Sequence, residues 1–162
     1  MEQLHKWTRL LLGSTFFKGK LSINFERWLK MDLRTAYAFG KTVDMTHVEA
    51  ERKVREELAK EGFGVLTEID VKKKFAEKLQ KEFREYLILG ACNPSLAYEA
   101  LSREIDLGAL LPCNVVIYTR DDGKTAVMVM DPIAALSMID NPEMVDFAKK
   151  VAEKMERVLF AL

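Results

Sequence analysis

A tight hairpin signal restricts the fold more than any other feature of this sequence. Asp122-Gly123 is a dipeptide typical of two-residue β-turns, and it joins two apolar runs, residues 111–119 and 125–130. These runs are expected to pair as antiparallel strands. With Asp122 and Gly123 as the whole loop, residue numbers of opposed partners add up to the same value, which sets the expected register.

Helix-start signals mark the other elements. Thr46, with Glu49 three residues later, forms a capping box, and Gly62 is placed to end the helix that follows. Asp70 is expected to cap a second helix, whose apolar positions recur at helical spacing and are expected to be buried. That stripe comprises Val71, Phe75, Leu79 and Phe83; strands are expected at residues 35–43, 63–69 and 86–92, and further helices after Pro94, Pro132 and Pro142.

This order of elements predicts an α+β fold with a mainly antiparallel β-sheet packed against helices. The strands are too few and too hairpin-like for a doubly wound parallel sheet. The chain of 162 residues is long enough for one domain and a short extension. We therefore expect a single α+β domain over residues 35–162, preceded by an N-terminal extension over residues 1–34.

Residues 1–34 differ from the rest of the chain in charge. They contain seven Lys or Arg, three acidic residues and both tryptophans, whereas the whole chain has 25 basic and 25 acidic residues. We expect a basic amphipathic helical extension, broken near Gly13 and Gly19. Such a segment suits contact with an anionic membrane surface or a protein partner. The other interpretation is that it packs on its own domain or on a dimer partner.

Composition argues against several classes of function. The net charge of zero gives no overall basic field for nucleic acid, and no apolar run approaches the length of a membrane span. Two cysteines are too few for a disulfide scaffold, so we expect a cytoplasmic protein. Neither a phosphate-binding glycine loop nor a zinc spacing occurs in the sequence, so we expect no metal and no cofactor.

The candidate site is built around the two cysteines. Cys92 and Cys113 are each followed by an asparagine, Asn93 and Asn114. If the strand ending at Cys92 lies antiparallel to the one starting near Cys113, the thiols lie close together. The two-residue hairpin would place Asn114 opposite Asp131. The helices expected after Asn93 and Asp131 would add N-termini that attract anions and lower a nearby thiol pKa.

Two interpretations of this cluster follow. In the first, Cys92 is the catalytic nucleophile and Cys113 the resolving or supporting thiol, while Asn93, Asn114 and Asp131 bind a small anionic ligand. In the second, both cysteines are core residues, the asparagine at 93 and the aspartate at 131 are helix caps, and the cluster is structural.

Five stretches resemble the family known as domain of unknown function 302, DUF302. They are residues 41–44 (KTVD), 62–71 (GFGVLTEIDV), 88–94 (ILGACNP), 111–115 (LPCNV) and 130–132 (MDP). The resemblance covers about residues 36–162. It implies an α+β fold and a small homodimer, but no activity, because the family's activity is not established.

Combining residues and resemblance, we expect a cytoplasmic homodimer. It would bind a small anionic ligand or perform thiol or redox chemistry at a Cys92/Cys113 pocket. The alternative is a non-enzymatic interaction module, in which the cysteines are structural and function lies in the dimer surface and the cationic residues 1–34.

Overall fold

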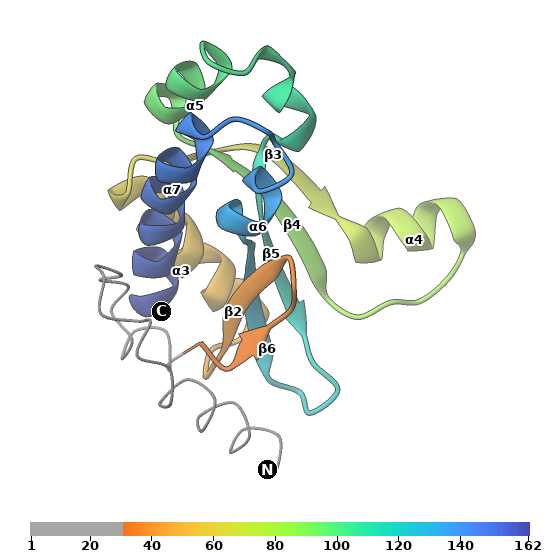
Figure 1. The fold of residues 1–162 in the computed structure, drawn as a ribbon. Helices are drawn as coiled ribbons and strands as arrows, with labels where there is room; N and C mark the ends of the chain where they lie inside the picture. Colours follow the sequence, from red (N-terminus) through yellow and green to blue (C-terminus); the bar gives the residue numbers. More distant parts are fainter. Residues whose placement is uncertain (1–30) are drawn as a thin grey trace.

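The computed structural model describes residues 31–162, which form an α+β fold, as predicted (Figure 1). All six strands belong to one antiparallel sheet. The strands are β1 (Leu33–Arg34), β2 (Ala38–Val43), β3 (Gly64–Asp70), β4 (Tyr86–Cys92), β5 (Cys113–Thr119) and β6 (Thr125–Met130). Their order across the sheet is β1-β2-β6-β5-β4-β3.

The helices begin where the capping signals predict. Thr46 and Glu49 form the expected capping box, and the side chains of Asp70, Asn93 and Asp131 each accept a backbone N–H at a helix start. The helices are α3 (His47–Lys60), α4 (Val71–Leu79), α5 (Pro94–Leu101), the 3-10 helix η1 (Ile105–Leu110), α6 (Pro132–Leu136) and α7 (Glu143–Phe160).

The β5–β6 hairpin has a longer loop than the two residues predicted. Thr119 pairs with Thr125, and the Arg120 N–H donates to the Lys124 carbonyl over 2.8 Å. The loop therefore holds three residues, and the last of them, Gly123, has a φ of 80°. This left-handed conformation is the one that glycine adopts without strain at such a loop position.

The longer loop shifts the register by one residue. The predicted pairing of Asn114 with Asp131 is therefore wrong. Asn114 lies instead opposite Gly90 of β4, and the Asp131 N–H donates to the carbonyl of Tyr37 over 2.8 Å. Because side chains alternate between the two faces of a strand, a shift of one residue moves each side chain to a different set of neighbours.

Helices α3 and α7 cover one face of the sheet, and the core lies between them (Figure 1). Alternate residues of the central strands point into this core, as the two-residue period of a strand requires. The α7 helix buries eight of its residues, which makes it the main cover of the sheet. The buried apolar residues that the sheet contributes to this core are Phe39, Val43, Leu87, Leu89, Ala91, Val115, Ile117, Val127 and Val129.

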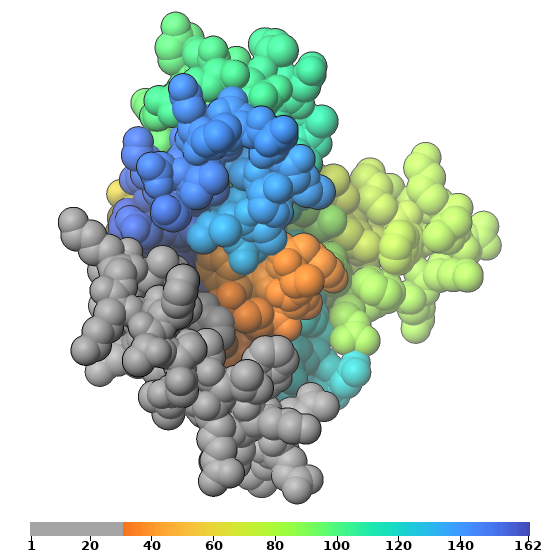
Figure 2. Space-filling model, viewed as in Figure 1, coloured from red at the N-terminus to blue at the C-terminus, as the bar shows by residue number. Residues whose placement is uncertain are grey.

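The opposite face of the sheet, here called the outer face, has no comparable helix layer among the described residues. Among the described helices, α4 extends from this side, and it projects away from the sheet as an arm (Figure 1). In the space-filling view the same segment forms a separate lobe (Figure 2). Ala126 is buried on this face, whereas its larger apolar residues are half-buried: Tyr86, Ile88, Val116, Tyr118, Met128 and Met130.

The expected burial of the α4 stripe is wrong. None of the nine residues of α4 is buried, and Leu79 is 57% exposed. The apolar residues do recur at helical spacing, but α4 lies too far from α3 and α7 to pack on them, so its apolar side meets no core among the described residues.

The expected N-terminal extension falls mostly on residues 1–30, which lie outside the described residues. Its last two residues, Leu33 and Arg34, form β1 and pair with β2. Within residues 31–162, no helix combines the length and apolar character needed to cross a membrane.

Gly90 generates a test of the packing between β3, β4 and the start of β5. A Cβ at this position would lie 2.1 Å from Thr67 Oγ1 and 2.6 Å from Pro112 Cγ. We expect Gly90→Ala to lower the free energy of unfolding by about 1–3 kcal/mol, because the proline ring cannot rotate away. Urea denaturation followed by circular dichroism measures it.

Gly64→Ala is the matched control, because a Cβ there would meet nothing within 4 Å. We expect it to change the free energy of unfolding by less than about 1 kcal/mol. Equal denaturation midpoints for the two variants would contradict the packing described here.

Candidate functional site

The two cysteines lie at the same edge of the sheet, where β4 ends and β5 begins. Cys113 pairs with Ala91, so Cys92 stands one residue beyond the cross-strand partner of Cys113. Both are free thiols, and both line one cavity of about 30 Å³. Cys92 is also close enough to influence the titration of Cys113 electrostatically.

The cavity between the thiols is small and apolar. It is about the size of a single water molecule, and a second cavity of the same volume is also lined by Cys113. A small anionic ligand therefore finds neither room nor positive charge there. Apart from Asn93, the lining of the two cavities is formed by thiols and apolar side chains from β4, β5, β6, η1, helices α5, α6 and α7, and the loop residues Phe63 and Leu111.

Burial in this apolar setting changes the acidity of Cys113. Desolvation, together with the nearby Cys92 thiol, raises the pKa of the Cys113 thiol to about 11. The thiolate is the nucleophilic form of cysteine, so this environment suppresses nucleophilic chemistry at Cys113 near neutral pH.

Asn93 uses both ends of its amide within the fold. Its Oδ1 accepts from the Leu96 N–H at the start of α5, and its Nδ2 donates to the carbonyl of Glu61 after α3. Gly62 makes room for this contact, since a Cβ there would lie 2.9 Å from the Asn93 Nδ2. Asn93 therefore connects the end of one helix to the beginning of another.

Asn114 and Asp131 do not join the cysteine cavity. The Asp131 Oδ1 accepts from the Ile133 and Ala134 N–H groups, so it caps α6. Asn114 is exposed on β5. Of the five predicted site residues, the structure brings Cys92, Asn93 and Cys113 together around one cavity and places the other two outside it.

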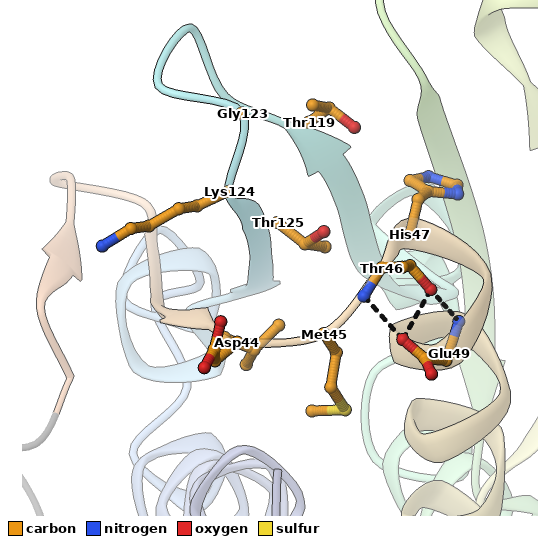
Figure 3. Close-up of a pocket in the computed structure, with 10 residues that line it drawn as sticks. Asp44, Met45, Thr46, His47, Glu49, Thr119, Gly123, Lys124 and Thr125 are labelled. Carbon is orange, nitrogen blue, oxygen red and sulfur yellow. Dashed lines mark hydrogen bonds between the residues drawn. The ribbon is translucent and has the colours of Figure 1, made fainter.

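A larger, polar hollow lies at the opposite end of β5 (Figure 3). Its volume is about 480 Å³, and it is formed where the β5–β6 hairpin meets the start of α3. We call it the polar hollow. It is lined by Val43, Asp44, Met45, Thr46, His47, Glu49, Thr119, Gly123, Lys124 and Thr125.

Sequence reasoning missed the polar hollow. The sequence does indicate two of its parts, the capping box at Thr46 and the hairpin at Gly123. No local pattern, however, shows that these two segments lie next to each other in the fold. The pairing of β2 with β6 brings them together, with Val43 opposite Thr125. Within residues 31–162, no three His, Cys, Asp or Glu side chains are grouped as metal ligands.

The structure thus defines a class: a small α+β protein with one antiparallel sheet, one helix-covered face and a projecting helical arm. The family model described as "Domain of unknown function DUF302" matches residues 39–162, so the chain belongs to the DUF302 family. No curated protein matches the chain.

A solved structure supports the same assignment. The chain is similar to an uncharacterized conserved DUF302 protein from Bacillus stearothermophilus, known from a crystal structure, with 27% sequence identity and a TM-score of 0.74. The match covers 78% of this chain and 98% of the other. The family and this neighbour establish the fold and leave the activity open.

Alkylation of the native protein tests the acidity of Cys113. With a pKa of about 11, roughly 0.1% of this thiol is ionised at pH 8. We expect iodoacetamide to modify Cys113 at least tenfold more slowly in the native Cys92→Ser variant than in urea, with a rate still rising between pH 8 and 9.5. A rate that levels off below pH 8.5 would contradict the burial of this thiol.

Proposed function

We propose that this protein is a non-enzymatic interaction module that works as a homodimer, assembled through the arm and the outer face of the sheet. The observation that carries the proposal is the α4 helix. It has nine residues, none of them buried, and an apolar stripe. Isolated helices of this length are unstable in water, so a helix of this kind needs a surface to pack against.

The apolar surface of the arm continues onto the sheet. Phe75 of α4 contacts Phe83 edge to face at a centroid distance of 5.1 Å, and Phe83 lies 5.9 Å from Tyr86 of β4. Tyr86 in turn stacks on Tyr118 of β5 at 5.6 Å. This aromatic row supports one continuous docking surface rather than two separate patches.

The edge of the sheet adds to this surface. Ile69 of the edge strand β3 is 45% exposed and lies opposite Ile88, on the same side as the aromatic row. Contiguous apolar surface of this kind is characteristic of protein interfaces.

A second copy of the chain is the occupant that fits best. Each copy carries both parts of the surface, an arm and an outer face, so the arm of one copy can pack on the outer face of the other and the reverse. This reciprocity is the property of a two-fold symmetric interface. The net charge of zero means that two copies approach without overall repulsion.

Leu79→Glu tests the proposal, because it places a charge on the arm at a residue that is 57% exposed. We expect the wild-type chain to sediment at twice its 18.6 kDa mass and the variant to sediment as a monomer at the same concentration, since a buried unpaired charge weakens an interface strongly. Analytical ultracentrifugation of the full chain measures both.

Val145→Glu is the matched control. Val145 is 55% exposed and lies on α7, which packs on the other face of the sheet. We expect this variant to remain a dimer. A monomeric wild type, or equal dissociation of the two variants, would overturn the proposed interface.

Thiol chemistry is the second candidate function, because both thiols line one cavity. An oxidant such as oxidised glutathione would accept the two electrons and two protons that the thiols lose on forming a disulfide. The raised pKa of Cys113 opposes this role near neutral pH. The contribution of residues 1–34 as a contact segment stays a prediction, since residues 1–30 lie outside the described part of the chain.

A further inference from the structure

We propose that charge orients the homodimer, so that the cationic arm of one copy packs beside an acidic lobe of the other copy. This inference rests on the proposed function and adds to it a second contact surface and a direction. We call residues 71–85, which contain α4 and the chain that returns from it to β4, the arm segment. The acidic lobe comprises residues 94–110 and 132–146, which include α5, η1, α6 and the start of α7.

The two parts of the acidic lobe lie against each other, at the end of the sheet that holds the two cysteines. An ion pair of 3.7 Å between Arg103 and Glu143 joins them, and they adjoin in the space-filling view (Figure 2). The arm segment leaves the side of the sheet instead, well apart from the lobe (Figure 1). One copy of the chain therefore carries two separate surfaces.

The two surfaces are opposite in charge. The arm segment contains six Lys or Arg and three acidic residues, whereas the acidic lobe contains six acidic residues and one arginine. The net charge of zero for the whole chain hides this separation. Surfaces of opposite sign attract each other between two copies when the arm segment of one copy meets the acidic lobe of the other.

Both surfaces keep charges that their own chain does not neutralise. Lys78 and Lys81 of the arm segment are exposed, and within residues 31–162 neither side chain forms an ion pair or a hydrogen bond. The same holds in the acidic lobe for the exposed Asp106 and Asp140 and for the half-buried Glu104. These charges are therefore available to a second copy.

Exposed apolar side chains accompany the charges on both surfaces. Lys78 lies three positions after Phe75 and directly before Leu79, so it borders the apolar stripe of α4. In the acidic lobe, Tyr98 is 79% exposed and Ile105 is 77% exposed. Apolar groups next to polar and charged ones are the composition of an interface, which favours a contact surface over a solvated one.

The direction of the strands decides which arrangement brings opposite charges together. The arm segment follows Asp70, which pairs with Leu87 near the start of β4, whereas the acidic lobe begins beyond Cys92, where β4 ends. A two-fold axis that runs across the strands places the arm segment of each copy toward the lobe end of the other. An axis along the strands would place like charges beside each other, so the charge pattern favours the first arrangement.

The salt dependence of the dimer tests this attraction, and analytical ultracentrifugation of the full chain measures it. We expect the dissociation constant to rise about tenfold between about 50 and 500 mM NaCl, because salt screens attraction between exposed charges. A dissociation constant that stays constant or falls would overturn the contact between arm and lobe and leave the homodimer standing. A chain that is monomeric at both salt concentrations would overturn the homodimer as well.

Charge reversal locates the contact. We expect Lys78→Glu to raise the dissociation constant about fivefold at about 50 mM NaCl, because each charge counts twice in a two-fold dimer. Asp106→Lys combined with Asp140→Lys should weaken the dimer in the same way. Adding Lys78→Glu to that lobe variant should tighten the dimer again, since the reversed charges attract each other.

Lys73→Glu is the matched control. Lys73 is an exposed lysine of the same helix, without an ion pair or a hydrogen bond of its side chain within residues 31–162, and it lies two positions from Phe75, on the side away from the stripe. We expect it to change the dissociation constant less than about twofold. Equal weakening by Lys73→Glu and Lys78→Glu would overturn the assignment. Weakening by the lobe variant alone would mean that another cationic segment contacts the lobe, and would overturn the arm as its partner.

Discussion

The central strands of the sheet are apolar on both faces, and the described helices cover only one. Val115 and Ile117 point into the core beneath α3 and α7, whereas Val116 and Tyr118, the residues between and after them, stay half-buried on the outer face. A strand with one solvated face normally alternates apolar and polar residues. This departure from alternation is the constraint on which the rest of the molecule depends. An outer face that is apolar needs other apolar groups to pack against it, and the projecting arm carries a surface of that kind.

The elements of this fold could be predicted because their signals are local. A threonine three residues before a glutamate, or an asparagine before a proline, determines a helix start through contacts within one turn, and each of these starts is observed. The hairpin register could not be determined in this way. Asp122-Gly123 suits both a two-residue loop and the end of a three-residue loop, and the choice is made by the pairing of Thr119 with Thr125.

The two edges of the sheet differ in what they leave unsatisfied. At the cysteine edge, Asn93 and Asp131 both have partners, and the space between the thiols is apolar and about the size of one water. At the hairpin edge, the side chains of Lys124 and Asp44 have none within the described residues, and the space is many times larger. Cysteines attract attention in a sequence because they are rare and reactive.

The polar hollow is an example of a feature that sequence reasoning could not locate. Its lining comes from residues 43–49 and from residues 119–125, two segments far apart in the chain that only the pairing of β2 with β6 brings together. The cysteine cluster, in contrast, lies on neighbouring strands whose adjacency can be guessed from chain order. Because local patterns identify sites on adjacent elements, a site assembled across the sheet becomes visible only when the strand order is known. The same holds for the arm. Its apolar stripe can be recognised in the sequence, but whether the stripe packs on the core of this domain or on another surface depends on where β3 ends relative to α3 and α7. In this fold β3 is the edge strand, so the chain that follows it leaves the covered part of the sheet.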